Sequence, residues 1–287
     1  MTVTKARRRV LAGLAGVAAL PALSPAAARA APEADLWPRW EAHSPSATRE
    51  PDHARWATFL NRYLRAGADG INRIAYGAVT RDDRDTLRRY LDAMAAVDPA
   101  DLDRDAQFAY WVNLYNALTV ATVLDHHPVD SIRDIDISPG WFADGPWGKK
   151  LISVAGTSLS LDDIEHRILR PIWRDPRVHY AVNCAALGCP NLQPAPFSRT
   201  GLEATLDAAA RAFVNHPRGA AVDAGRLRVS SIYIWFKADF GGTDAGVIRH
   251  LARYARAPLA ERLDPADGIA DHAYDWRLND VSQTTAS

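Results

Sequence analysis

Both cysteines of the chain, Cys184 and Cys189, lie in one short segment that ends in a glycine–cysteine–proline turn. His179 and Asn183 come just before the first of them. Thiols, an imidazole and an amide at this density suit three kinds of chemistry: a thiolate nucleophile, a metal site, or a disulfide that shapes the loop. Two inert buried thiols are a fourth state that the sequence leaves open.

In the enzyme hypothesis, Cys184 attacks a carbonyl group while His179 or His166 takes and returns the proton. Glu165 or Asn183 would orient that base, and the backbone amides of the turn after Cys184 would stabilise the oxyanion. The expected activity is that of a thiol-type hydrolase or acyl transferase acting on peptide or cell-envelope amide bonds.

Two alternatives use the same residues differently. A Cys184–Cys189 disulfide would make the protein a non-catalytic binding or scaffold domain, with a loop closure worth only about 2 kcal/mol. A zinc site would combine the two sulfurs with His179, His166 or both, as in a metal-dependent hydrolase. No other cofactor is expected, because the sequence has no glycine-rich phosphate loop and no His-Glu-x-x-His pattern.

The segment Arg177–Val182 is predicted to be a β-strand that leads into the cysteine turn. Side chains alternate between the two faces of a strand, which places His179 with Asn183 and opposite Cys184. The pairing of His179 with Cys184 therefore needs the strand to end early. A short helix is predicted at residues 161–169, which would carry Glu165 and His166.

A long central helix is predicted over Asp105–His127, where apolar residues cover most of the helix circumference. Pro128 ends it. Asn113 and Asn116 would be buried in this helix, and buried amides need hydrogen-bond partners. We therefore expect these two asparagines to tie the helix to a neighbouring loop.

The remaining pattern places helices early and hairpins late, which is typical of an α+β fold with a helical N-terminal half packed on a mostly antiparallel sheet. The expected further elements are helices at 52–65, 80–97, 200–215, 232–239 and 246–254, hairpins at 149–161 and 220–231, and a last strand at 272–276.

Residues 1–30 have the pattern of an export signal, with three consecutive arginines, the apolar run Val10–Leu20 and a small-residue cleavage site near Ala30. The paired arginines favour the twin-arginine route; the Sec route is the alternative, because Ala6 replaces the usual Ser or Thr. The expected location is periplasmic or secreted. The apolar run is shorter than the roughly 20 residues that span a bilayer.

After the signal, we expect a linker at 31–50, a single α+β domain at 51–280 and a disordered tail at 281–287. The signal carries five of the 34 basic residues and none of the 34 acidic ones, so the mature chain is acidic. That charge argues against a nucleic-acid partner. No second apolar stretch approaches membrane length, so no stable membrane insertion is expected after signal removal.

Six motifs in this chain carry a resemblance to a known family. They are Tyr110–Ala117 (YWVNLYNA), Gly145–Lys150 (GPWGKK), Ser160–His166 (SLDDIEH), His179–Pro190 (HYAVNCAALGCP), Tyr233–Gly241 (YIWFKADFG) and Tyr274–Trp276 (YDW). Together they resemble domain-of-unknown-function family 547 over roughly residues 102–279. The family occurs in exported bacterial proteins and in plant proteins, and the resemblance implies no reaction.

A second resemblance, at the level of fold, is to the papain-like and transglutaminase-like group. It rests on the central helix at 105–127 and on a strand histidine at His179, and it implies that the helix packs on an antiparallel sheet. Members of that group carry the nucleophilic cysteine at the start of the helix, where this chain has none. The resemblance would therefore require Cys184 to act from a different position.

Overall fold

The computed structural model describes residues 32–140, 144–264 and 266–283. The predicted export signal at 1–30 and the last four residues of the predicted tail lie outside these ranges. Within them, no helix combines the length and the apolar character that a membrane crossing requires.

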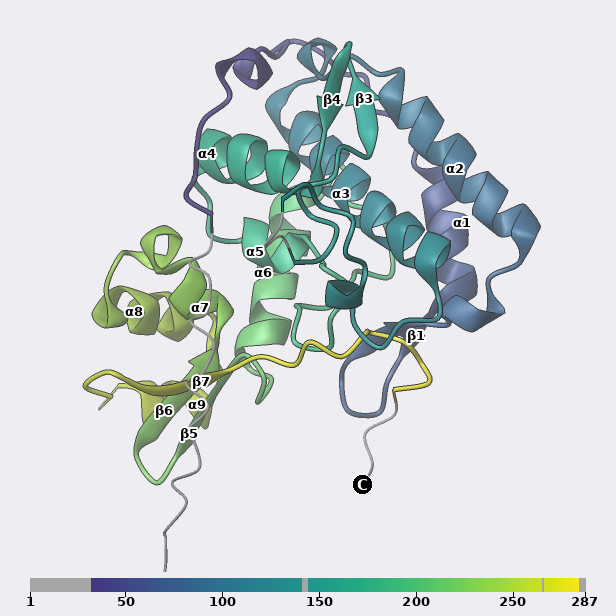
Figure 1. Ribbon diagram of the computed structural model, residues 1–287. Helices are drawn as coiled ribbons and strands as arrows, with labels where there is room; N and C mark the ends of the chain where they lie inside the picture. Colours follow the sequence, from purple (N-terminus) through teal and green to yellow (C-terminus); the bar gives the residue numbers. More distant parts are fainter. Residues whose placement is uncertain (1–31, 141–143, 265, 284–287) are drawn as a thin grey trace, which may run out of the picture. The chain divides into compact units, whose positions relative to one another are not determined.

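The long helix α3, Arg104–His126, confirms the predicted central helix. Its N-cap is Asp103, whose carboxylate accepts a hydrogen bond from the amide of Ala106. Most of its side chains are buried, all around the helix, as predicted from the apolar residues that cover its circumference. Helix α2 packs along one side of α3, and the π-helical segment η5 packs against another (Figure 1).

Two amphipathic helices precede α3 and confirm the predicted pair: α1, Ala54–Tyr63, and α2, Arg81–Ala95. Thr80 caps α2 by accepting a hydrogen bond from the amide of Asp83, and acidic residues occupy its first turn. Between the two helices lie the paired strands β1, Leu64–Ala66, and β2, Asn72–Ile74, and the short turn η2, Tyr76–Ala78. A second short turn, η3, Pro99–Asp101, connects α2 to α3.

The described part of the segment expected as a linker, residues 32–50, packs against the domain. It contains the short helix η1, Pro38–Glu41. The Trp40 side chain is buried and meets Trp111 of α3 edge-on, with ring centroids 5.2 Å apart. The amide of Asp35 donates to the carbonyl of His166 at 3.0 Å. The composition of this segment, rich in Pro, Ala and Ser, is typical of a linker and gives no sign of these contacts.

The α+β class is confirmed, but the described strands form three small sheets and not one broad one. Both predicted hairpins are present: β3, Ile152–Val154, with β4, Thr157–Leu159, and β5, Ala220–Asp223, with β6, Arg226–Ser230. The last strand, β7, covers Ile269–Ala273 and pairs in parallel with β6.

The β5–β6–β7 sheet belongs to a second apolar cluster in the C-terminal part of the chain, which includes Tyr180, Phe213 and Tyr233. The helical elements of this region are α6, Leu202–Val214, α7, Ile232–Trp235, η6, Lys237–Phe240, α8, Asp244–Tyr254, and α9, Leu259–Leu263. Figure 1 shows α7 and α8 close to this sheet and α6 between it and the N-terminal helices.

Candidate functional site

The segment before the cysteines is a short helix, α5, Val178–Ala181, so the prediction of a strand over Arg177–Val182 is wrong. The turn starts at Asp175–Pro176, where the Asp175 carboxylate accepts a hydrogen bond from the Arg177 amide at 2.8 Å. All four helical residues are buried, and a short apolar run does not distinguish a buried helix from a buried strand. The strand alternation that placed His179 opposite Cys184 therefore does not apply.

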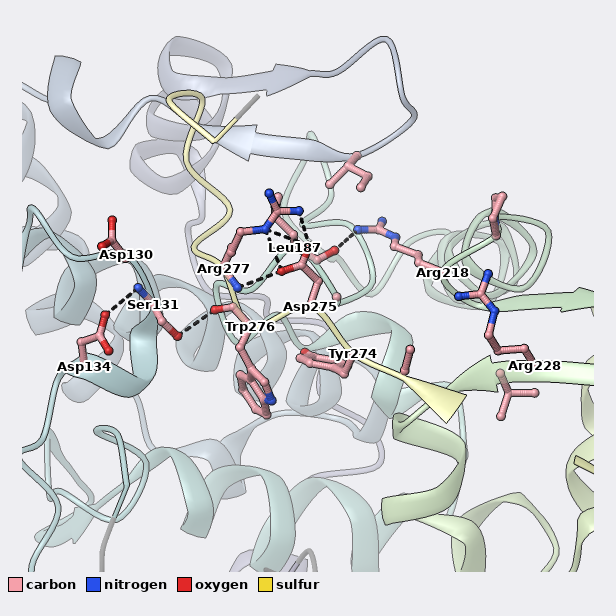
Figure 2. A pocket seen from close by; sticks show the side chains of 15 residues that line it. Asp130, Ser131, Asp134, Leu187, Arg218, Arg228, Tyr274, Asp275, Trp276 and Arg277 are labelled. Atoms are coloured by element: carbon pink, nitrogen blue, oxygen red, sulfur yellow. Dashed lines mark hydrogen bonds and ion pairs between the residues drawn. The ribbon is translucent and has the colours of Figure 1, made fainter. Parts of the chain in front are cut away.

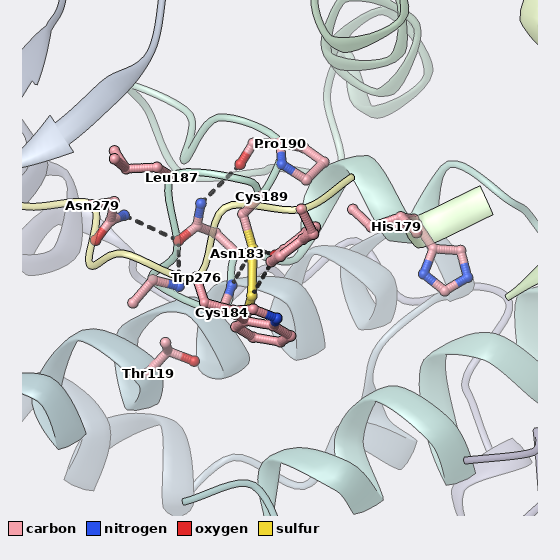
Figure 3. Close-up of a disulfide and its surroundings, with 12 residues drawn as sticks. Thr119, His179, Asn183, Cys184, Leu187, Cys189, Pro190, Trp276 and Asn279 are labelled. Carbon is pink, nitrogen blue, oxygen red and sulfur yellow. Dashed lines mark hydrogen bonds between the residues drawn. A yellow bond between two sulfur atoms is a disulfide. The ribbon is translucent and has the colours of Figure 1, made fainter. Parts of the chain in front are cut away.

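Residues 183–190, which we call the disulfide loop, contain a covalent bond between Cys184 and Cys189 (Figure 3). This is one of the four states that the sequence leaves open for the two sulfurs. The Cys184 amide donates to Cys189 Sγ at 3.0 Å. The hydroxyl of Tyr274 lies 3.1 Å from Cys184 Sγ and 3.0 Å from Cys189 Sγ.

The side chain of Asn183 holds the disulfide loop in shape. Its Oδ1 accepts hydrogen bonds from the amide of Ala185 at 2.9 Å and from Asn279 Nδ2 at 3.2 Å. Its Nδ2 donates to the carbonyl of Pro190 at 2.8 Å (Figure 3). The polar atoms of Asn183 are therefore engaged in fixing the loop, and in this arrangement they do not orient a catalytic base.

The backbone amides of the loop donate hydrogen bonds within the protein. The amides of Leu187 and Gly188 donate to the carbonyls of Arg277 and Asp275, each at 2.8 Å. Gly188 permits this approach, because a Cβ atom there would lie 2.8 Å from the Asp275 nitrogen. The Ala185 amide is bound to Asn183 Oδ1, so these three amides are engaged within the protein, and the turn is the docking edge of the C-terminal segment. The predicted oxyanion role of the turn stays a prediction.

The two buried asparagines of α3 tie that helix to neighbouring loops, as predicted. Asn116 Nδ2 donates to the carbonyl of Ala181 at 2.9 Å, and its Oδ1 accepts from the amide of Asn183 at 2.8 Å. Asn113 makes the same two-way contact with the backbone of Phe197, at 2.8 and 3.0 Å. The start of the disulfide loop is thus positioned directly by the central helix.

His179 belongs to a second polar group, which we call the buried charge cluster: Glu165, His166, Arg170, His179 and Asp239. The Nε2 of His179 lies 2.7 Å from Asp239 Oδ2, and its Nδ1 lies 3.7 Å from Glu165 Oε1. The ring stacks on Phe236 with centroids 4.3 Å apart. Both ring nitrogens of His179 therefore face carboxylates.

Arg170 is the central cation of this cluster. It is the first residue of α4, Arg170–Trp173, directly after η5, Asp163–Leu169, the predicted short helix that carries Glu165 and His166. The guanidinium of Arg170 donates to both oxygens of Asp239, at 2.6 and 3.2 Å. It also lies 3.0 Å from His166 Nδ1, which must then accept and leave the ring proton on Nε2.

Burial and hydrogen bonding set the ionisation of this cluster. Burial lowers the pKa of His166 to about 4, so that ring is neutral at pH 7. Burial by itself raises the pKa of Asp239, but the hydrogen bonds from His179 and Arg170 outweigh it and hold that pKa below its usual range. Asp239 is therefore a carboxylate at neutral pH, compensated by Arg170.

The structure thus brings three of the five predicted catalytic residues together, namely Glu165, His166 and His179, and leaves Cys184 and Asn183 in the disulfide loop. Figure 3 shows the His179 ring directed away from the disulfide. Glu165 instead accepts a hydrogen bond from the hydroxyl of Tyr115 at 3.0 Å. Sequence proximity of His179 and Cys184 does not make them one site.

A zinc site that combines the two cysteines with His179, His166 or both is one of the alternatives left open by the sequence. Within the described ranges, no group of three or more His, Cys, Asp or Glu side chains is arranged to hold a metal ion. In the oxidised loop each sulfur is bonded to the other, so a zinc site needs the reduced form, and it stays a prediction.

A pocket of about 690 Å³ lies on the outer side of the disulfide loop (Figure 2). Leu187 and Gly188 of the loop form part of its wall. The rest comes from Asp130, Ser131 and the turn η4, Ile132–Asp134, from Ile71, from Pro217 and Arg218, from β6, and from residues 273–277. Sequence reasoning missed Arg218 and Arg228, because neither lies in a recognisable motif; the Tyr274–Trp276 motif was the available signal.

Comparison with known proteins yields one match. No curated protein and no solved structure matches the chain, so the papain-like likeness stays a prediction. Residues 99–214 match the family model DUF547, described as a protein of unknown function. This range contains α3, the disulfide loop and four of the five residues of the buried charge cluster. The predicted family resemblance is therefore confirmed for the part of the chain that holds most of the candidate site: residues 99–214 resemble the DUF547 family.

Proposed function

We propose that this protein is an exported, non-catalytic ligand-binding domain in which the disulfide loop forms one wall of the binding pocket. The observation that carries the proposal is that the sulfur expected to be a nucleophile is bonded to its neighbour, while the same loop lines the pocket. Attack on a carbonyl requires a thiolate, which an oxidised sulfur does not provide. A disulfide also agrees with an oxidising compartment outside the cytoplasm.

The pocket has the properties of a small-molecule site. Its volume of about 690 Å³ lies within the range of roughly 300–1,000 Å³ that such sites occupy. Tyr274 and Trp276 supply aromatic surface, and Trp276 packs with Trp235 at a centroid distance of 5.6 Å and with Tyr274 at 4.6 Å. A rigid aromatic wall of this kind loses little conformational entropy when a ligand binds.

The test is a titration of the full mature protein with benzoate, benzyl alcohol and benzamidine, followed by tryptophan fluorescence and calorimetry. We expect saturable binding of at least one probe, with a Kd on the order of millimolar for ligands of this size. Ala273 is exposed and lines the pocket, so the bulky ring of Ala273→Phe should obstruct it and weaken binding. Ala270→Phe is the matched control, an exposed alanine of the same strand away from the pocket.

Binding that persists unchanged in Ala273→Phe, or no saturable binding of any probe, would overturn the proposal. The absence of binding counts against the proposal when the protein is folded and when alkylation followed by mass measurement shows an intact disulfide.

A second candidate, the thiol-type hydrolase or acyl transferase, is favoured by one observation. The Tyr274 hydroxyl and the Cys184 amide lie within 3.1 Å of the sulfurs, and such donors would stabilise a thiolate after reduction. The test is to reduce the protein and to follow both iodoacetamide labelling and cleavage of peptide anilides. Cleavage that needs reductant and disappears in Cys184→Ser but not in Cys189→Ser would replace the binding proposal.

A further inference from the structure

Two arginines face the pocket from the same end. Arg218 follows α6 and Arg228 lies on β6, and Figure 2 shows both at the end of the pocket opposite Asp130 and Asp134. The Arg228 side chain is exposed. Positive charge from two side chains at one end of a pocket favours an anionic group there.

Arg218 is held in place by neutral groups. Its Nη1 donates to the carbonyl of Leu187 and its Nη2 to Asn191 Oδ1, each at 2.6 Å. Its Nε is buried without a hydrogen-bond partner, and the guanidinium carbon lies 5.5 Å from the centroid of the Phe213 ring. These contacts fix the position of the guanidinium group without an ion pair to a carboxylate.

Within the described ranges, no carboxylate forms an ion pair with Arg218 or Arg228. Burial lowers the pKa of Arg218 to about 10, which shows that desolvation of its charge is only partly offset by its surroundings. The group is still charged at pH 7. A buried cation without an anion is costly, and a bound anion would remove that cost.

The other charges of the pocket limit what kind of anion fits. Asp275 is neutralised by its own ion pair with Arg277, at 2.5 Å. Asp130 and Asp134 give the opposite end negative charge, since Asp134 only accepts a hydrogen bond from the Ser131 amide. A second anionic group on the ligand would meet these carboxylates and be repelled.

We propose that this pocket binds an organic monoanion, with its carboxylate against Arg218 and Arg228 and its apolar body against Tyr274 and Trp276. This rests on the proposed function and adds the charge and chemical class of the ligand. Arginine is suited to this role because its planar group matches a carboxylate with two hydrogen bonds.

The experiment compares benzoate with the neutral benzyl alcohol, the cationic benzamidine, the dianionic terephthalate and phenyl phosphate. Benzoate should bind at least tenfold more tightly than benzyl alcohol and benzamidine, and more tightly than both dianions. Arg228→Ala should weaken benzoate binding about fivefold to tenfold and leave benzyl alcohol unaffected, whereas Arg226→Ala should change neither. Arg226 is the matched control, because it is an exposed arginine on the same strand outside the pocket.

Arg218→Lys should also weaken benzoate binding, but its contacts with the loop make Arg228→Ala the decisive variant, since an exposed side chain can be removed without loss of folding. Equal affinity for benzoate and benzyl alcohol, or an equal loss in Arg228→Ala and Arg226→Ala, would overturn the inference while the pocket itself remained a binding site. Tighter binding of phenyl phosphate than of benzoate would overturn the choice of a monoanionic carboxylate.

Discussion

The disulfide loop and the buried charge cluster are neighbours in sequence but are built on different principles. The loop is fixed by one covalent bond and by hydrogen bonds between neutral groups, centred on Asn183. The cluster is fixed by buried ionic contacts among Arg170, Asp239 and His179. One borders a pocket; the other is mostly buried, with the His179 side chain 2% exposed and the Asp239 side chain 21% exposed.

This contrast shows that one short helix can place neighbouring residues of a motif in two different sites. Only four residues separate His179 from Cys184, yet α5 directs the imidazole to Asp239, while the chain after it turns to meet α3 and Tyr274. The reactive residues of this short segment therefore belong to two separate structural centres, His179 to the buried charge cluster and Cys184 to the disulfide loop. The following predictions test whether the two are as different as their contacts suggest, in order of decreasing effect.

The largest effect should come from removing the cation of the charge cluster. Arg170→Met leaves the Asp239 carboxylate without its main partner, and we expect the free energy of unfolding to fall by about 3 kcal/mol. Urea denaturation measures this. The matched control is Arg88→Met, whose side chain is 56% exposed and pairs with Asp125, and which should cost less than about 1 kcal/mol. Equal losses would mean that the cluster is not a buried ionic centre.

Removing the covalent bond of the loop should have a smaller effect. The double variant Cys184→Ala/Cys189→Ala should lose about 2 kcal/mol, because the bond closes only a short loop. The wild-type protein in reductant should approach the same value when both thiols can be alkylated. A wild-type stability that does not respond to complete reduction would show that hydrogen bonds alone hold the loop.

Acid should act on the cluster and not on the loop, which has no titratable side chain once oxidised. The pKa of His166 is about 4 when folded and 6.5 when unfolded, so between these values only the unfolded chain binds the proton. Stability therefore falls as pH is lowered from 6.5 to 4. In His166→Gln the slope of unfolding free energy against pH should be shallower by about 1.4 kcal/mol per pH unit.

Two other histidines, His53 and His250, also have their pKa lowered to about 4 by burial, and they contribute equally to both proteins in this comparison. The difference between the two slopes therefore reports His166. Parallel slopes would contradict the burial of a neutral imidazole at this position.

The smallest effect concerns the tyrosine that contacts both sulfurs. Tyr274→Phe removes a hydroxyl that would donate to a thiolate, so the reduced form should lose about 1 kcal/mol. The disulfide should then become about fivefold harder to reduce in a glutathione equilibrium. Easier reduction in the variant would mean that the hydroxyl supports the oxidised state, which would weaken the thiol-enzyme alternative.

The elements predicted most reliably from sequence were those with local signals. The cap at Thr80, the apolar circumference of α3 and the turns of both hairpins each appear in a few adjacent residues, and the structure confirms them. The role of Asn116 also followed, because a buried amide must find a partner. These inferences need no knowledge of distant contacts.

The features that were predicted wrongly or missed depend on contacts between residues that are far apart in sequence. Helix α5 has the apolar composition of a strand, and its Asp175–Pro176 start was the signal overlooked. The His179–Asp239 pair joins positions 60 residues apart, and Arg218 reaches Leu187 across 31. No periodicity or spacing encodes such pairs, so the sequence named reactive residues without showing which of them meet.

Residues 274–281 connect segments that are distant in sequence. Arg277 and Asn279 exchange backbone hydrogen bonds with residues 185 and 187, and the carbonyl of Asn279 accepts from the amide of Ile74 in β2. A ribosome therefore releases Cys184 some 90 residues before the tyrosine that caps the sulfurs. The backbone contacts that hold the disulfide loop therefore form only after this last segment has been made.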